Sequence, residues 1–370
     1  MTKHRLVAGI ATALTMAMAP VGSAAAQRVE RVAEMPAHLT ILPVRVHGRV
    51  ERKGDALVRQ WPGSYVETAF DGATALFTIG AGEVGLHVIV DGREIDTLVR
   101  PAPGVYRIDG LPGGRHELRI EVASESQAGP TRLGPFYAAQ RAVMPPPPAR
   151  ARQIEFVGDS HTVGYGVTSA KRECTQDEVW RTTDTSRGFG ALLAHRYDAD
   201  YEINAISGRG IVRNYNGFAA NTLPDAYPYT VFDRQSRATD PDWHPQVIVV
   251  ALGTNDFTTP LHAGETWATR DALHADYEAR YVRFVQSLRA RDPKALIVLW
   301  ATDLADGEIA AEVTKVVAKL RASGERRLAY VPVNGLAFTA CNAHPSLADQ
   351  KVIADRIAGA IDTQADAWQR

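Results

Sequence analysis

The first half of the chain is a series of short runs of strand length, separated by turn-forming residues. Residues 116–122 alternate cleanly between polar and apolar side chains, and the apolar run 85–90 ends at an Asp-Gly turn. No helical period of useful length interrupts this pattern. Regularly spaced short strands with turn residues predict a β-sandwich over residues 39–143, and we expect residues 27–38 to form a flexible lead-in.

The pattern changes after four consecutive prolines, which predict a stiff linker over residues 144–152. From residue 153 to residue 370, apolar runs of strand length alternate with longer segments of helical period. Such alternation predicts an α/β domain with a parallel sheet and helices on both faces. The expected strands cover residues 154–157, 201–205, 247–252, 295–300 and 328–333, and the expected helices cover residues 188–197, 271–291, 308–322 and 346–367.

The N-terminus has the layout of a secretory leader. Residues 3–5 are Lys-His-Arg, an apolar stretch follows, and residues 23–26 are small. This predicts a signal peptide over residues 1–26 and a periplasmic or secreted protein. No later stretch reaches about 18 apolar residues, so we expect no membrane association after cleavage. The net charge of −1 does not favour nucleic-acid binding, and the sequence does not reveal the oligomeric state.

Side chains that could take part in catalysis follow three of the expected strands. Ser160 comes after the first strand in a Gly-Asp-Ser turn, Asn255 after the third, and His344 after the last. Ligands in open α/β sheets bind at the carboxyl edge of the strands. We therefore interpret Ser160 as a candidate nucleophile and His344 as its candidate base, although a Gly-Asp-Ser turn also caps ordinary helices.

The order of Ser, Gly, Asn and His with these local sequences resembles the SGNH (GDSL-like) esterase superfamily. The string Gly-Asp-Ser-x-Thr-x-Gly-Tyr-Gly-Val at 158–167, with residues 206–211, resembles carbohydrate esterase family 2 in particular, and residues 61–70 resemble the start of that family's jelly-roll domain. The resemblance implies a flavodoxin-like SGNH hydrolase domain behind a jelly-roll sandwich. It also implies an oxyanion hole made by the N–H groups of Ser160 and Gly208 and the side chain of Asn255.

The chain departs from the superfamily pattern beside the histidine. Many members carry an aspartate three residues earlier, where this chain has Cys341. We expect a Ser–His dyad whose imidazole is oriented by the Asn342 side chain or by a nearby carbonyl group. An aspartate acting from further away, Asp303 or Asp306, is the alternative. Asp159 and Asp256, which neighbour the candidate residues, are assigned to hydrogen bonds in turns.

The two cysteines are Cys174 and Cys341, and export permits a disulfide between them. Both lie near the site if the fold is as the resemblance implies, so a bridge is our hypothesis and two separate thiols are the alternative. Aromatic and basic residues in the neighbouring loops are candidates for lining a sugar site, with ordinary packing as the alternative. These candidates are Tyr165, Arg209, Tyr215 and Trp267.

Several motifs are absent from the sequence. It contains no G-x-S-x-G elbow, no P-loop and no H-E-x-x-H, which argues against a standard α/β-hydrolase, a P-loop nucleotide-binding protein and a zinc hydrolase. We expect no cofactor and no metal. The resemblance implies a serine esterase that removes O-acetyl groups from a polysaccharide or oligosaccharide of the xylan or glucomannan type.

Four other functions remain open from the sequence. The first two are a broader esterase or thioesterase, and an esterase that acts on bacterial cell wall or exopolysaccharide. The others are a carbohydrate-binding protein with an inactive hydrolase domain and a metal-dependent phosphoesterase.

Overall fold

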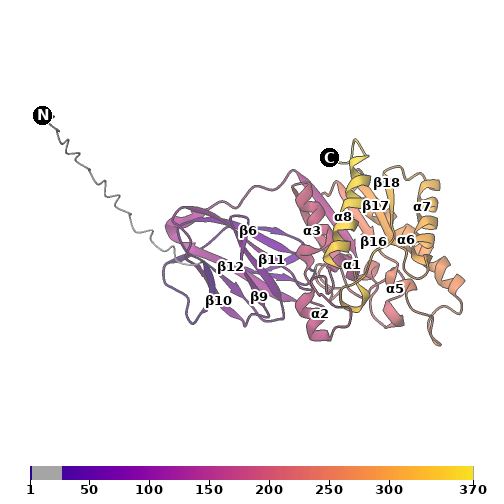
Figure 1. Cartoon of the computed structure of the whole chain (residues 1–370), viewed down its shortest axis with the longest axis horizontal. Helices are drawn as coiled ribbons and strands as arrows, with labels where there is room; N and C mark the ends of the chain where they lie inside the picture. Colours follow the sequence, from indigo (N-terminus) through magenta and orange to yellow (C-terminus); the bar gives the residue numbers. More distant parts are fainter. Residues whose placement is uncertain (2–26, 370) are drawn as a thin grey trace.

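Alternating side chains build two packed antiparallel sheets in the first half of the chain, as expected. In strand β11 (Arg115–Val122), His116, Leu118 and Ile120 face inward and are buried, while the intervening residues are more exposed. The computed structural model describes Met1 and residues 27–369, so the expected signal peptide, apart from Met1, lies outside the described residues. Figure 1 shows this β-sandwich at one end of the molecule and the α/β domain at the other.

One sheet of the sandwich has the order β1-β10-β7-β12-β5-β4, and β2 also pairs with β12. The other has the order β13-β6-β11-β8-β9, with β3 paired to β6. Besides β11, the strands are β1 (Arg28–Val32), β2 (Leu39–Ile41), β3 (Arg45–His47), β4 (Val50–Lys53), β5 (Ala56–Arg59), β6 (Tyr65–Asp71), β7 (Ala75–Ile79), β8 (Gly85–Val90), β9 (Arg93–Val99), β10 (Gly104–Asp109), β12 (Thr131–Ala139) and β13 (Val143–Met144).

The sandwich begins earlier than the sequence indicated. Residues 28–32, which were expected to belong to a flexible lead-in, form β1 and pair with β10, so that Val29 lies opposite Ile108. β1 is an edge strand whose residues are mostly half-buried or exposed. Its position depends on main-chain pairing, on the packed Val29 and on polar contacts such as that of Arg31 with the Pro103 carbonyl, and these leave little apolar pattern to read.

A parallel sheet with helices on both faces forms the second half, which confirms the expected fold class. Its order is β15-β14-β16-β17-β18. Alternate residues of a strand point to opposite faces. Phe156 belongs to the core cluster with α3 (Phe189–Arg196) and α8 (Leu347–Asp362), and the adjacent Val157 to the cluster with α6 (Arg270–Arg291) and α7 (Glu308–Ala322). The strands are β14 (Arg152–Gly158), β15 (Ala199–Ala205), β16 (Val247–Ala251), β17 (Leu296–Thr302) and β18 (Leu328–Val333).

Four longer helices cover this sheet, and shorter ones lie in its loops. The longer ones are α3 (Phe189–Arg196), α6 (Arg270–Arg291), α7 (Glu308–Ala322) and α8 (Leu347–Asp362), close to the expected ranges. None of the helices within the described residues has both the length and the apolar composition of a membrane span. The short helices are α1 (Ser160–Val163), α2 (Gln176–Thr182), α4 (Leu223–Ala226), α5 (Thr254–Phe257), η1 (Gln140–Ala142), η2 (Thr185–Arg187), η3 (Tyr215–Gly217) and η4 (Cys341–Ala343).

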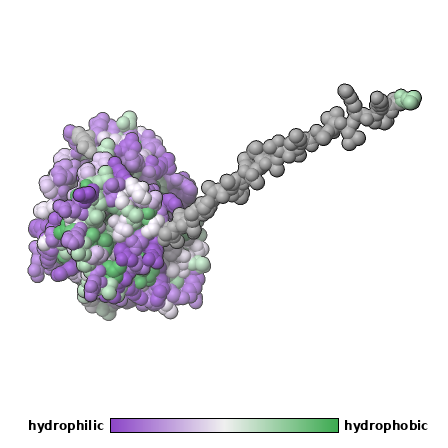
Figure 2. All heavy atoms as spheres, turned by 90° about the vertical axis from the view of Figure 1, so that its left-hand side faces the viewer, coloured by the Kyte–Doolittle hydropathy of each residue, from purple (hydrophilic) through white to green (hydrophobic). Residues whose placement is uncertain are grey.

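The two domains share buried side chains. Trp61 and Tyr65 of the sandwich are fully buried and belong to the two cores of the α/β domain. The Tyr65 hydroxyl donates to Asp200 at 3.1 Å. The free end of the sandwich, by contrast, presents intermixed hydrophilic and hydrophobic residues (Figure 2). The sandwich is therefore fixed against the hydrolase domain through its inner end.

Candidate active site

Ser160 is presented by a turn at the carboxyl end of β14. Gly158 ends the strand, and a Cβ at this position would lie 2.0 Å from Thr162 Oγ1, so only glycine fits. Asp159 caps the short helix α1, and its Oδ1 accepts the His161 N–H at 3.1 Å. Ser160 is the first residue of that helix and is 5% exposed. Its position is thus set by the buried central strand.

The structure brings His344 to Ser160. The Ser160 hydroxyl donates to His344 Nε2 across 2.8 Å. The other ring nitrogen, Nδ1, lies 2.9 Å from the carbonyl oxygen of Cys341 and 3.1 Å from that of Asn342. Because carbonyl oxygens only accept, Nδ1 must carry the proton, and Nε2 is left free to take the proton of Ser160.

Of the two expected ways of orienting His344, the Asn342 side chain or a nearby carbonyl group, the geometry shows the second. The main-chain carbonyl of Asn342 faces the imidazole, but its side chain donates to the Tyr165 hydroxyl at 3.0 Å. Asn342 and Ala343 both have left-handed backbone angles, with φ of 52° and 56°. This tight turn directs the carbonyl groups of residues 341 and 342 toward the ring.

The distant aspartate receives no support from the geometry. The Asp303 carboxylate accepts the main-chain N–H of Gly335 at 3.0 Å. The Nδ1 atom of His344 is already satisfied by the two carbonyl groups. The arrangement is therefore a dyad held by the main chain.

A disulfide between Cys174 and Cys341 is present in the structure. It ties the turn before His344 to the segment that leads into α2. The turn also packs closely against Gly166, where a Cβ would lie 2.4 Å from Cys341 Cβ. The Asn342 N–H adds a hydrogen bond to the Arg172 carbonyl at 2.5 Å. The loop that carries the histidine is thus held by a covalent link and by main-chain contacts.

The three expected oxyanion donors surround the same turn. Within the described residues, the N–H groups of Ser160 and Gly208 have no hydrogen-bond partner, which leaves them available to a ligand. Asn255 Nδ2 donates to Asp159 Oδ2 at 3.1 Å and to the Arg209 carbonyl at 2.9 Å. Asn255 therefore links the serine turn to the Gly208 loop.

Asp256 fixes the next part of that loop. Its carboxylate accepts the main-chain N–H groups of Ile211, Val212 and Arg213 at 3.0, 2.9 and 2.9 Å. This is the turn-stabilising role expected from the sequence.

Burial controls the protonation of the site. It lowers the pKa of His344 to about 4, so the imidazole is neutral and basic above that pH. Burial, together with the nearby charge of His344, lowers the pKa of His161 to about 3. Burial and the neighbouring Asp256 raise the pKa of Asp159 to about 7, against opposing hydrogen bonds.

Tyr165 is the expected lining residue that lies closest to the dyad. Its ring centre is 4.2 Å from that of His344. It lines a cavity of about 470 Å³ together with Ser207 and Trp180. Sandwich residues 82–83 and 124–130, which no local sequence pattern indicated, also line it. Both domains therefore line the cavity that contains Tyr165.

The other three residues expected to line a sugar site do not all lie near the dyad. Arg209 lies over the Phe218 ring, 4.9 Å from its centre. The Tyr215 side chain is 52% exposed, and its N–H donates to the Gly208 carbonyl. Trp267 lines a different cavity, and its indole donates to Asp276. The structure thus associates Arg209 and Tyr215 with the Gly208 loop but does not bring Trp267 to the dyad.

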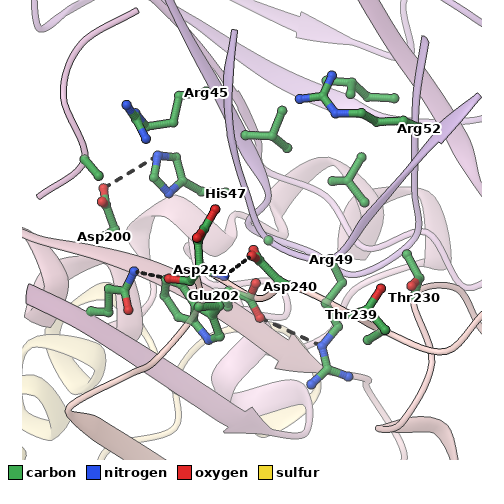
Figure 3. A pocket seen from close by; sticks show the side chains of 18 of the residues that line it. Arg45, His47, Arg49, Arg52, Asp200, Glu202, Thr230, Thr239, Asp240 and Asp242 are labelled. Atoms are coloured by element: carbon green, nitrogen blue, oxygen red, sulfur yellow. Dashed lines mark hydrogen bonds and ion pairs between the residues drawn. The ribbon is translucent and has the colours of Figure 1, made fainter. Parts of the chain in front are cut away.

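One buried cluster among the described residues contains side chains that could bind a metal ion, but an arginine side chain already pairs with its two carboxylates. His47, Glu67 and Asp200 lie within 4.8 Å of one another. Arg150 donates to Asp200 at 2.7 Å and to Glu67 at 3.2 Å. Figure 3 shows His47 directed at Asp200 in a cavity between the domains. Asp200 is near the start of β15, whereas Ser160 follows the end of β14, so this group is remote from the dyad.

Two family models match the chain. Carbohydrate esterase 2 N-terminal matches residues 46–148, and the GDSL-like lipase/acylhydrolase family matches residues 156–356. The two matches correspond to the sandwich and to the α/β domain.

Relatives match across both domains. An acetylxylan esterase / glucomannan deacetylase of Cellvibrio japonicus (strain Ueda107) is 40% identical over 333 residues, covering 88% of this chain and 92% of the relative. A solved carbohydrate esterase, described as having divergent catalytic and non-catalytic binding functions, has 38% identity and a TM-score of 0.83, covering 89% of this chain and 100% of the other. A family two carbohydrate esterase from Clostridium thermocellum, solved with cellohexaose, has 26% identity and a TM-score of 0.77, covering 88% and 100%.

Proposed function

Because the chain belongs to carbohydrate esterase family 2, with a GDSL-like hydrolase domain, we propose that it is a serine esterase that removes O-acetyl groups from carbohydrate. The family resemblance drawn from the sequence motifs is thereby confirmed. The observation that carries the proposal is the 2.8 Å contact between Ser160 Oγ and His344 Nε2, with Nδ1 facing two carbonyl groups.

The dyad accounts for both halves of ester hydrolysis. His344 Nε2 takes the hydroxyl proton as Ser160 Oγ attacks the acetyl carbon. We assign oxyanion binding to the N–H groups of Ser160 and Gly208 and to the Asn255 amide, which must release one of its present hydrogen bonds for it. His344 then protonates the departing sugar oxygen and leaves an acetyl-serine. Finally His344 Nε2 takes a proton from a water molecule as the water oxygen attacks the acetyl carbon. The bond between that carbon and Ser160 Oγ then breaks, His344 returns the proton to Oγ, and acetate is released.

We propose acetylated xylan or glucomannan as the substrate class. Support comes from the 40% identical relative, which is an acetylxylan esterase / glucomannan deacetylase. The cavity lined by Tyr165 and the sandwich loops offers room for the sugar that carries the ester. An esterase with broader specificity, or one acting on bacterial cell wall or exopolysaccharide, would use the same dyad.

The residues argue against an inactive domain. A pure carbohydrate-binding protein would have no use for an imidazole whose free nitrogen faces a serine hydroxyl.

From the layout of the N-terminus we also propose that the enzyme acts in the periplasm or outside the cell. Cell fractionation with an antibody against the chain tests this: a cytoplasmic protein that keeps residues 1–26 would contradict it.

The function is tested by acetate release from 4-nitrophenyl acetate, acetylated xylan and acetylated glucomannan. Wild type is compared with Ser160→Ala, and Ser323→Ala, at the exposed end of α7, is the matched control. We expect release from the small ester and from a polymer, lost only in Ser160→Ala. Release from 4-nitrophenyl acetate alone would keep the mechanism and replace the proposed polymer. Equal release by Ser160→Ala would contradict the serine mechanism.

A further inference from the structure

The main chain of Ser207, the residue before Gly208, is held by the sandwich domain. Its N–H donates to Glu125 Oε1 at 2.7 Å, and its carbonyl accepts from Gln127 Nε2 at 3.1 Å. Gln127 Nε2 also lies 3.0 Å from Glu125 Oε1, so the two side chains act as one unit. Both belong to the loop between β11 and β12. The sandwich domain thus forms hydrogen bonds with both the N–H and the carbonyl group of this one residue of the hydrolase domain.

One peptide plane connects these two hydrogen bonds to the proposed oxyanion hole. The carbonyl of Ser207 and the N–H of Gly208 belong to the same planar unit, and in a trans peptide they point in opposite directions. The hydrogen bond from Gln127 to the carbonyl therefore fixes the direction of the Gly208 N–H. Gly208, at φ 81°, adds little restraint of its own because glycine has wide backbone freedom.

We propose that Glu125 and Gln127 are positioning residues for ester hydrolysis, which hold the Gly208 N–H in the direction that binds the oxyanion. The inference rests on the proposed function and assigns a mechanistic role to the sandwich domain. The hydrolase domain fixes other parts of the same loop: Tyr215 N–H donates to the Gly208 carbonyl at 2.9 Å, and Asp256 binds the following N–H groups. The Ser207–Gly208 peptide is the part that the sandwich supports.

The surroundings favour a lasting contact. Ser207 is 8% exposed, and buried main-chain polar groups nearly always keep a hydrogen-bond partner. Burial raises the pKa of Glu125, while the hydrogen bonds from Ser207 and Gln127 act in the opposite direction. These residues also line the cavity that contains Tyr165 and Trp180. A role in binding sugar and a role in positioning the peptide must therefore be separated by experiment.

The experiment compares steady-state kinetics of full-length Glu125→Ala, Gln127→Ala and Glu125→Gln. The main substrate is 4-nitrophenyl acetate, whose small leaving group does not need the sugar cavity, and acetylated xylan is the second. Glu117→Ala and Gln140→Ala, on exposed sandwich positions that do not touch Ser207, are the matched controls. Thermal unfolding and circular dichroism verify the fold. Gln127 is exposed, so its variant provides the test if Glu125→Ala fails to fold.

We expect the two alanine variants to lower kcat on both substrates by about tenfold to a hundredfold, with KM little changed, since misplacing one donor costs less than removing it. Glu125→Gln retains an acceptor oxygen and should restore most of the rate. Unchanged kcat on 4-nitrophenyl acetate would overturn the inference, as would an effect confined to KM for xylan. Failure of the proposed function is recognised separately, because Ser160→Ala would then remain as active as wild type.

Discussion

The residues of the proposed site are held in position in two different ways. Ser160 and Asn255 follow the ends of β14 and β16, strands that are buried on both faces. His344 and Gly208 lie in loops, where a disulfide, left-handed turns and contacts from the sandwich hold them. Core packing positions the nucleophile and one donor, whereas individual cross-links position the base and another donor. The second kind of support is the one that single substitutions or reduction can remove.

Removing the imidazole should have the largest effect. We expect His344→Ala to lower kcat on 4-nitrophenyl acetate by about 10⁴-fold or more, because neither Ser160 nor the deacylating water then has a base. His244→Ala, whose side chain is 73% exposed, is the matched control and should retain full activity. A loss of less than tenfold in His344→Ala would mean that another group takes the proton.

Asn255 tests the strand-end support of the oxyanion hole. We expect Asn255→Ala to reduce kcat by about 10²–10³-fold through loss of one donor. Because Asn255 also joins Asp159 to the Arg209 carbonyl, the melting temperature should fall as well. Asn334→Ala, at an exposed position, serves as the control. An unchanged kcat would remove Asn255 from the oxyanion hole.

The disulfide tests the loop support directly. We expect Cys174→Ser/Cys341→Ser to lose about 2–5 kcal/mol of unfolding free energy, as is typical for a native disulfide. Its kcat should fall about tenfold, since the carbonyl of Cys341 that holds His344 becomes less fixed. Denaturant unfolding and kinetics measure both quantities. Reductant should reproduce the change in wild type and leave the double variant unaffected; wild-type kcat that is insensitive to complete reduction would contradict this role.

The pH profile should show the smallest but most specific effect. The base is active only when neutral, and burial lowers the pKa of His344 to about 4. The dependence of kcat/KM on pH should therefore stay level through weakly acidic conditions and fall only as the pH approaches about 4. An acid limb centred near the ordinary histidine value of about 6.5 would show that the imidazole is less desolvated than the structure indicates.

The same contrast separates what the sequence predicts from what it does not. Ser160 follows a mostly apolar run and Asn255 an uninterrupted one, so their place at the sheet edge could be predicted from hydrophobicity and turn residues. The contacts of Glu125 and Gln127 with Ser207 join loops of two domains and follow no periodic pattern. The orientation of a side chain in a loop depends on contacts from elsewhere in the fold, which a local sequence pattern does not contain.

Two site residues illustrate that limit. The identity of residue 342 as asparagine did not determine whether its side chain or a carbonyl group would face the histidine. The left-handed turn directs the carbonyl group of Asn342 toward the ring. Trp267 was a lining candidate because it is aromatic and lies in a loop. Its indole is instead bound to Asp276 beside another cavity.

The central claim is that the main chain alone orients the catalytic base. It is tested most directly by the kcat of Asp303→Ala and Asp306→Ala on 4-nitrophenyl acetate, measured beside wild type. Because carbonyl groups of Cys341 and Asn342 occupy Nδ1 of His344, we expect both variants to stay within about threefold of wild type. A loss near 10⁴-fold in either would show that a carboxylate completes a triad and would contradict the dyad.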